Sequence, residues 1–388
     1  MTATILGWSH TPFGRHDGAD VESLIAEVAV QACHDAGVEP VDVDEIVLGT
    51  FGEGFQPQGF PASLVLQADE AFRFKPATHL ENACATGSAA LHAGLKTIGA
   101  GRARFVLVVG VEHMTGLSNA EIAKCLLKAA YLKEEGAIEG GFVGVFARIA
   151  QQYFQAHGDQ SDALAAIAAK NHANGSVNPL AQLQKDLGYE FCRRESDKNP
   201  SVVHPLKRTD CSLVSDGAAA LVLAAPEAAA GRARAVSVRT AVQVNDFLPM
   251  SKRDVTRFEG CREAWSRALA ESGLSLDDLD LVETHDCFTI AELIEYEAMG
   301  LCEPGQGARA ALEGWTAKDG RLPVNPSGGL KSKGHPIGAT GVSMHVMAAM
   351  QLVGEAGAMQ LPQADRAGVF NMGGAAVANY VSILEAGS

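Results

Sequence analysis

The chain of 388 residues lacks the features that mark membrane and secreted proteins. It has no apolar run of the roughly 18 residues that a membrane-spanning helix requires. Its N-terminus, MTATILGWSHTPFGR, has no basic segment followed by a long apolar stretch, and it predicts a strand rather than a signal peptide. We therefore expect no membrane insertion and a cytoplasmic location.

Paired cysteine motifs are also missing. The eight cysteines include no CxxC pair and no zinc-type combination of cysteine and histidine. In a chain of this length they do not indicate a disulfide framework. We expect free thiols, most of them small core residues, and no metal site.

Positive charge is scarce, because the chain has 31 Lys and Arg but 46 Asp and Glu, which gives a net charge of −15. Phosphate backbones and anionic membranes attract basic surfaces, so this balance argues against nucleic acid or a charged membrane as partner. Two local basic spots, Lys252-Arg253 and the pair Lys331 and Lys333, could still bind a small anion.

The chain does contain internal similarity. Residues 25–49 and 261–286 share one order: amphipathic helix, glycine, Asp-rich turn and short apolar strand. In a second pair, a turn leads into an Ala-rich helix, with Cys84 in the first turn and His335 in the second. Strands at 104–113 and 367–376 follow these helices, and apolar segments at 216–224 and 373–386 form a last pair. Four pairs in one order favour a duplicated α/β chain over chance likeness.

Helices rich in Ala pack closely on all sides, so these two predict a buried central layer between two sheets. Residues 119–204 are richer in charge and predict an insertion of helix and loop. We therefore expect an N-terminal half of residues 1–118 and 205–235, an inserted loop domain of 119–204, and a C-terminal half of 236–388.

Cys84 precedes a predicted helix, where unpaired N–H groups and the helix dipole stabilise a thiolate. The alternative is a small buried cysteine. His335 occupies the equivalent place in the second half, so duplicates packed face to face would bring a nucleophile and a base into one pocket. The alternative for His335 is a hydrogen-bonded loop histidine, but the glycines around it expose N–H groups of the kind that an oxyanion site needs.

Two further segments carry polar chemistry. His285 and Cys287 lie two residues apart in HDCF and would point the same way in an extended chain, although a capping histidine and a core cysteine are equally good interpretations. Gly373 and Gly374 permit close backbone approach to a ligand.

These segments resemble the thiolase superfamily, and within it the sterol-carrier-protein-X type. The matching pieces run in family order over essentially the whole chain: ENACATGSAALHAG, PLKRTDCSLVSDGAAALVL, HDCF, NPSGGLKSKGHPIGATG and NMGGAA. The resemblance implies a five-layered αβαβα fold, acyl-CoA and coenzyme A as substrates, and no permanently bound cofactor. It also implies at least a homodimer or a dimer of dimers, and leaves open a small accessory protein.

The resemblance implies catalytic roles as well. Cys84 would accept the acyl group, and His335 would activate it and bind a thioester oxygen. His285 would hold the same oxyanion site, and the backbone N–H groups of Cys84 and Gly373 would form a second one. The common thiolases have a second catalytic cysteine near the C-terminus, where this chain has Asn371-Met372-Gly373. The resemblance to the sterol-carrier-protein-X type implies that the acid and base thiol comes from HDCF instead, so Cys287 is the predicted acid and base.

The expected activity is CoA-dependent cleavage of 3-ketoacyl-CoA, or the reverse Claisen condensation, through an acyl-Cys84 intermediate. Two alternatives remain. One is a retro-aldol lyase that acts on a CoA thioester with a small partner protein, and the other is a non-catalytic scaffold subunit of the same fold.

Overall fold

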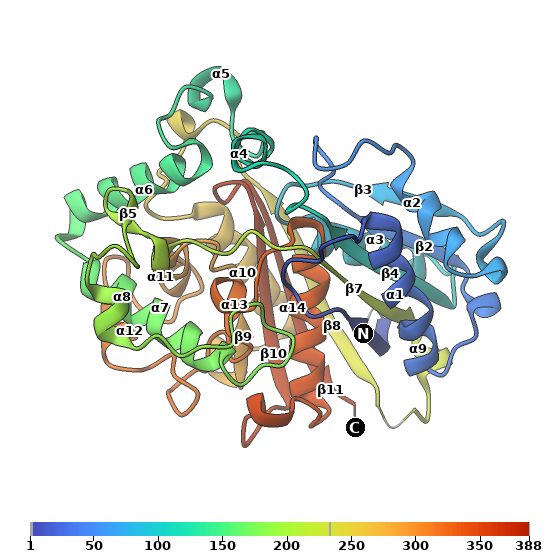
Figure 1. Ribbon diagram of the computed structural model, residues 1–388. Helices are drawn as coiled ribbons and strands as arrows, with labels where there is room; N and C mark the ends of the chain where they lie inside the picture. The colour runs from blue at the N-terminus through green and yellow to red at the C-terminus, as the bar shows by residue number, and fades with distance from the viewer. Residues whose placement is uncertain (1–2, 233, 388) are drawn as a thin grey trace.

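The computed structural model describes residues 3–232 and 234–387 (Figure 1). Its strands are β1 (Ala3–His10), β2 (Glu45–Gly49), β3 (Ala77–Leu80), β4 (Phe105–Glu112), β5 (Ser201–Val203), β6 (Leu206–Lys207), β7 (Gly217–Ala224), β8 (Val236–Asn245), β9 (Leu281–Glu283), β10 (Arg366–Gly373) and β11 (Ala378–Ala386). Its helices are α1 (Val21–Asp35), α2 (Pro61–Leu64), α3 (Thr86–Gly99), α4 (Asn119–Leu127), α5 (Leu132–Glu135), α6 (Gly141–His157), α7 (Ser161–Gly175), α8 (Tyr189–Arg193), α9 (Pro226–Ala229), α10 (Glu259–Ser272), α11 (Thr289–Ala298), α12 (Gly307–Leu312), α13 (Gly329–Ser332) and α14 (Ile337–Leu352).

One mixed sheet runs through the molecule. Among the described residues it has nine strands in the order β3-β2-β4-β7-β1-β8-β11-β10-β9. The two halves of the sheet meet where β1 pairs antiparallel with β8, Ala3 opposite Val238 and Ile5 opposite Val236. The other edge of β1 pairs antiparallel with β7.

The two halves have the same topology. In the first, β2 runs parallel to β3 and β4, and β7 is antiparallel to β4 and β1. In the second, β9 runs parallel to β10 and forms a parallel bridge from Val282 to Val324, and β11 is antiparallel to β10 and β8. This repeated order confirms the predicted duplication.

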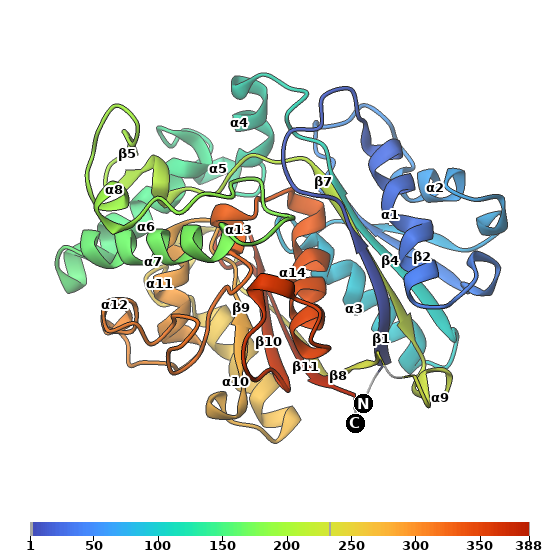
Figure 2. The same ribbon diagram turned by 60° about the horizontal axis from the view of Figure 1, so that its bottom comes forward.

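Helices form three layers around the two half-sheets (Figures 1 and 2). Helix α1 packs on β1, β4 and β7, and α10 packs on β8 and β11. Between the half-sheets lie α3 and α14, which contact each other, and α14 touches β4 and β7 on one side and β9, β10 and β11 on the other. Of the sixteen residues in α14, fifteen are buried. The predicted five-layered αβαβα fold and its central helical layer are confirmed.

Glycines allow the two central helices to approach within backbone contact. A Cβ atom on Gly87 of α3 would lie 2.7 Å from the backbone nitrogen of Val342. A Cβ atom on Gly341 of α14 would lie 2.2 Å from the backbone nitrogen of Ser88. Side chains larger than hydrogen would separate the helices at their N-terminal ends. These ends are where the candidate residues of both halves lie.

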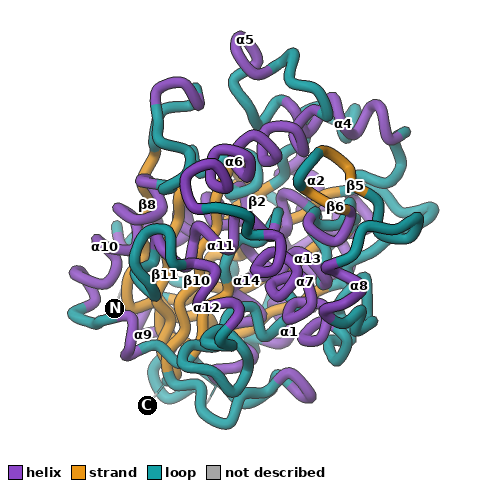
Figure 3. Tube along the Cα trace, turned by 90° about the vertical axis from the view of Figure 1, so that its left-hand side faces the viewer, coloured by secondary structure: helices purple, strands orange, loops and turns teal. Residues whose placement is uncertain are grey.

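The segment from α4 to α8 packs on the C-terminal half. Helix α7 contacts α11, α12 and α13, and α6 contacts α4 and α11; Figure 3 shows α6, α7, α8 and α12 from this side. The exact limits of the three domains stay predictions. Within the described part of the chain, no helix combines the length and hydrophobicity that crossing a bilayer requires.

Candidate active site

Cys84 lies in the tight turn between β3 and α3, two residues before the helix begins. Ala83 has a φ of 48°, in the left-handed region that residues with a side chain rarely adopt. Three contacts hold this turn: Ala83 N–H donates to Glu81 (2.5 Å), Asn82 N–H to the Thr86 hydroxyl (2.8 Å), and Ala85 N–H to the Asn82 carbonyl (3.1 Å). The strained turn fixes the sulfur at the end of the central layer.

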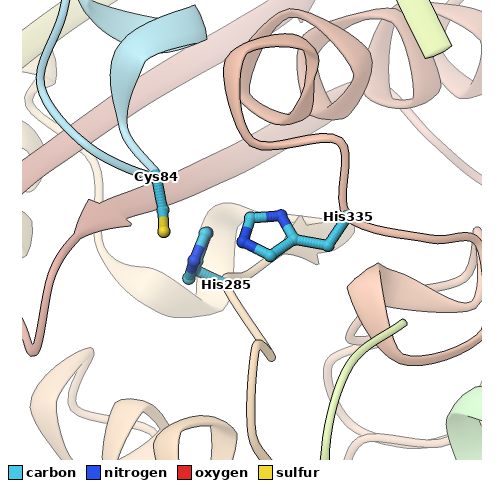
Figure 4. A group of neighbouring side chains, drawn as sticks. All are labelled: Cys84, His285 and His335. Carbon is cyan, nitrogen blue, oxygen red and sulfur yellow. The ribbon is translucent and has the colours of Figure 1, made fainter. Parts of the chain in front are cut away.

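Two histidines from the other half of the chain meet this sulfur (Figure 4). His335 precedes α14 by two residues, as Cys84 precedes α3, and His285 follows β9. The Cys84 sulfur and one ring nitrogen of each histidine all lie within 4.8 Å of one another. The two imidazole rings pack edge to face, with centroids 5.1 Å apart. The predicted approach of Cys84 and His335 is therefore present in the structure.

The hydrogen bonds of His335 identify its tautomer. The Thr340 hydroxyl donates its one proton to the Pro336 carbonyl (2.8 Å), so it must accept from Nδ1–H of His335 (2.6 Å). Burial and the nearby Lys333 ammonium lower the pKa of His335 to about 3, which keeps the ring neutral. Its Nε2 then carries a free lone pair, ready to accept the thiol proton.

His285 has the opposite tautomer. The Asn371 side chain on β10 donates from Nδ2 to the Cys84 carbonyl (3.1 Å) and contacts Nδ1 of His285 at 2.9 Å. Burial, aided by His335, lowers the pKa of His285 well below its usual range, so the ring is neutral and its proton is on Nε2. Within the described residues, this buried Nε2 has no hydrogen-bond partner.

The resting Cys84 is a thiol, contrary to the thiolate expected from its place at a helix end. Cys84 is buried, with 3 % of its surface exposed, and burial raises its pKa to about 12. The backbone N–H of Gly374 donates to the sulfur and opposes this shift, but burial is the larger effect. The sulfur contact is thus with Gly374, next to the predicted Gly373, whose role as an oxyanion donor stays a prediction.

Cys287 shares a pocket with Cys84 and His335. The pocket has a volume of about 110 Å³ and is mostly apolar. Burial, followed by the neighbouring Cys84, raises the pKa of Cys287 well above its usual range, so it is also a neutral thiol. The other lining residues are Met114, Leu126, Phe142, Val143, Cys211, Ser212, Leu213, Val214 and Phe288.

The lysines beside His335 are not an anion site. Lys331 and Lys333 each have 1 % of their surface exposed. Lys331 donates to the Cys211 carbonyl, and Lys333 donates to the Ser343 hydroxyl (2.8 Å). The sequence pattern predicts a basic surface here, but the buried lysines instead hold the backbone at Cys211 and a hydroxyl of helix α14.

The cysteine and two histidines are also ligand types that bind zinc. His335 offers a free lone pair to such an ion. His285 would first have to give up either its Nε2 proton or its contact with Asn371. No sequence motif pointed to Thr340 or Asn371, whose side chains contact Nδ1 of His335 and Nδ1 of His285. Asn371 was visible only as the residue that replaces a cysteine.

Comparison with known proteins identifies the family of this chain. The family described as "Thiolase, N-terminal domain" matches residues 3–227, and "Thiolase C-terminal domain-like" matches residues 242–386. An acetyl-CoA acetyltransferase of Methanothermobacter thermautotrophicus is 36% identical over 95% of this chain and 96% of that protein. Sterol carrier protein 2 of Oryctolagus cuniculus is 32% identical over 96% of this chain and 70% of that protein.

Among solved structures, the Ltp2-ChsH2(DUF35) aldolase superimposes with a TM-score of 0.84 at 21% identity, over 99% of this chain and 98% of that one. At this identity the likeness concerns the fold alone. The family matches span nearly the whole chain, and the acetyltransferase relative matches 95% of it. The chain therefore belongs to the thiolase family and is an acyltransferase of that family.

Proposed function

We propose that this acyltransferase cleaves 3-ketoacyl-CoA with coenzyme A, or runs the reverse Claisen condensation, through an acyl group on Cys84. The observation that carries the proposal is the meeting of three groups: the Cys84 thiol, the unprotonated Nε2 of His335, and the Nε2–H of His285, which has no partner among the residues that the structure describes. Together they supply a nucleophile, its base and a donor for a carbonyl oxygen.

In the cleavage direction, His335 Nε2 takes the proton of Cys84 while the sulfur attacks the 3-keto carbon. Electrons of the C=O bond move to oxygen, which accepts a hydrogen bond from His285 Nε2–H. When the tetrahedral intermediate collapses, the bond between the 2- and 3-carbons breaks, and the electron pair becomes the enolate of acetyl-CoA. Cys287 gives its thiol proton to the enolate carbon, leaving a thiolate. Its raised pKa suits this role, because an acid must hold its proton in the resting state.

The second half-reaction restores both groups. The Cys287 thiolate takes the proton of incoming coenzyme A, and the CoA sulfur attacks the acyl-Cys84 thioester. Cys84 leaves as a thiolate and recovers its proton from the His335 imidazolium. A correctly aimed oxyanion donor contributes about 10²–10³-fold to such a rate, and the acid–base thiol about 10²–10⁴-fold.

One relative is named an acetyl-CoA acetyltransferase. This name supports acetyl-CoA as the small thioester that is released in cleavage and consumed in condensation. A homodimer or dimer of dimers belongs to the same proposal. A cytoplasmic location is also part of the proposal. A small accessory protein stays open; the aldolase with the same fold carries a DUF35 partner in its name.

The decisive test is acyl transfer to Cys84. Incubation with acetyl-CoA should add one acetyl group per chain, seen by intact mass spectrometry, on the peptide that contains Cys84. Neutral hydroxylamine should remove it, and Cys84→Ala should never acquire it. Assays with a panel of 3-ketoacyl-CoAs would then define the acyl group.

The retro-aldol lyase would be favoured if Cys84 gained no acetyl group and a 3-hydroxyacyl-CoA released an aldehyde or ketone. Retro-aldol chemistry needs no acyl-enzyme. Full biological activity of Cys84→Ala would favour the scaffold.

A further inference from the structure

We infer that Asn371 is a positioning residue that selects the Nε2–H tautomer of His285 and so supplies the oxyanion donor. The inference rests on the proposed acyl transfer, in which His285 donates to a carbonyl oxygen. It concerns a residue on β10 that touches no substrate in the proposed mechanism and acts only through His285.

The first step is the orientation of the Asn371 amide. Asn371 is fully buried at 0% exposure, and one end of its amide lies 3.1 Å from the Cys84 carbonyl oxygen. A carbonyl oxygen can only accept hydrogen bonds, so the end that faces it must be the NH₂ group. The same nitrogen lies 2.9 Å from Nδ1 of His285.

The second step is the consequence for the imidazole. An NH₂ group has two protons and no acceptor capacity, so one N–H donates to the Cys84 carbonyl oxygen and the other donates to Nδ1 of His285. Nδ1 must then be the unprotonated nitrogen. In a neutral ring the proton is on Nε2, the nitrogen that has no partner within the described residues.

The third step links this tautomer to the nucleophile. One amide holds both the backbone of Cys84 and the ring of His285, which come from different halves of the chain. The arrangement fixes the donor relative to the sulfur before any substrate arrives. Preorganised donors of this kind are worth more than flexible ones, because they need no reorganisation during the reaction.

Two isosteric variants separate tautomer selection from packing. In Asn371→Asp the carboxylate accepts a hydrogen bond from Nδ1–H of His285, so Nε2 is left unprotonated and the oxyanion loses its donor. In Asn371→Leu neither tautomer is selected. Both should lower kcat about 10²–10³-fold with KM changed only a few-fold. The matched control is Asn379→Asp, a buried asparagine on the adjacent β11 whose amide donates to the Ala376 carbonyl (3.0 Å).

The pH profile separates the two variants. The titratable groups that face His285 are the Cys84 thiol, the His335 ring, and Glu295, which accepts the backbone N–H of His285. The Cys287 thiol lies beside Cys84 in the same pocket. In Asn371→Asp the new carboxylate favours the imidazolium, whose two nitrogens both donate. Relative to wild type, the activity of Asn371→Asp should therefore recover as the pH falls, whereas that of Asn371→Leu should not.

A direct readout comes from nitrogen NMR of protein labelled with ¹⁵N-histidine, with His285 assigned by the signal lost in His285→Gln. We expect the proton on Nε2 in wild type and in Asn379→Asp, and on Nδ1 in Asn371→Asp at neutral pH. The inference would be overturned by a proton on Nδ1 of His285 in the wild type, or by an unchanged His285 tautomer in Asn371→Asp. Full kcat in either Asn371 variant would overturn it as well. Because the spectra need no turnover, a wild type that fails to acetylate would refute the proposed function without touching the tautomer assignment.

Discussion

At the scale of single residues, the site stores its reactive groups in neutral form. Burial raises the pKa of Cys84 to about 12 and lowers that of His335 to about 3, so neither thiolate nor imidazolium is populated near pH 7. The charge pair forms only when the sulfur attacks and the proton moves to Nε2. The neutral thiol protects the Cys84 sulfur from non-specific oxidation and alkylation, because those reactions act on thiolates.

One prediction follows for reactivity. The alkylation rate of Cys84 by iodoacetamide should rise about tenfold per pH unit from pH 7 to pH 10, because a raised pKa leaves the thiolate fraction far from saturation. Glutathione, a free thiol with a pKa near 8.5, should level off over the same range. Site-resolved peptide mass spectrometry measures the rate, and a Cys84 rate already constant at pH 7 would contradict the neutral thiol.

A second prediction separates the two thiols of the pocket. Cys287→Ala should lower thiolysis and condensation about 10²–10⁴-fold, yet leave Cys84 able to accept an acetyl group. Exchange of the acetyl-CoA methyl protons with D₂O should be lost in parallel. The control is Cys211→Ala, which removes another thiol from the same pocket, one that donates to the Lys207 carbonyl (3.5 Å). Should Cys211→Ala abolish exchange and Cys287→Ala retain it, the acid–base role would belong to Cys211.

The sequence could predict the main reactive groups, but not their protonation states or the residues that hydrogen-bond to them. Cys84 and His335 stood at equivalent points of a repeat, so duplication alone implied their meeting. The helix end suggested a thiolate because motifs reveal helix ends and do not reveal burial, which here dominates. Asn371 was missed because its two contacts join segments 287 and 86 residues away in the chain.

At the scale of elements, the crossing of α3 and α14 determines the distance between nucleophile and base. Both helices begin two residues after their reactive residue, so any change in the helix contact moves Cys84 relative to His335. The contact is made by glycines on both helices.

A pair of glycine variants within α3 tests this geometry. Gly87→Ala should lower the free energy of unfolding by about 1–3 kcal/mol, because its Cβ would lie 2.7 Å from the Val342 nitrogen, and it should reduce acetylation of Cys84. Gly99→Ala, where a Cβ would meet nothing within 4 Å, should keep full activity and stability. Denaturant titration and intact mass measure both effects. Equal behaviour of the two variants would mean that the helix crossing tolerates expansion.

Element boundaries were predictable where the hydrophobic pattern is strong and less so at turns. The strand expected at 104–113 is β4, Phe105–Glu112. The last apolar segment was expected from residue 373, but Gly373 ends β10 and β11 begins at Ala378. Residues 374–377 turn the chain between them, and Val377 N–H donates to the Gly373 carbonyl (3.0 Å). Small apolar residues in GGAAV suit a strand and a tight turn alike, so the pattern could not separate them.

At the scale of the whole molecule, one end of the sheet is the best candidate for contact with a second copy. Strand β3 is the outermost strand of the described sheet on the N-terminal side, and Thr78 and His79 are exposed. In the segments that precede it, Phe60 and Phe74 have 83% and 86% of their surface exposed. Unpaired strand edges with nearby apolar side chains favour association.

We therefore expect sedimentation equilibrium to give at least twice the chain mass of 40.6 kDa. The double variant Phe60→Ser, Phe74→Ser should shift the protein toward 40.6 kDa. Phe247→Ser, at a phenylalanine 61% exposed after β8, should leave the mass unchanged. A wild-type protein of single-chain mass would refute the expected dimer.

The place of β1 between β7 and β8 has a consequence for synthesis. Its residues 3–10 pair with strands that begin at Gly217 and Val236, so β1 leaves the ribosome more than two hundred residues before either partner. At about 5–20 residues per second, that interval lasts roughly ten to fifty seconds. During this time a strand of buried apolar residues has no pairing edge, which makes the nascent chain a natural client for chaperones. The half-sheet that carries the nucleophile cannot close until β7 has been translated, after the whole segment from α4 to α8.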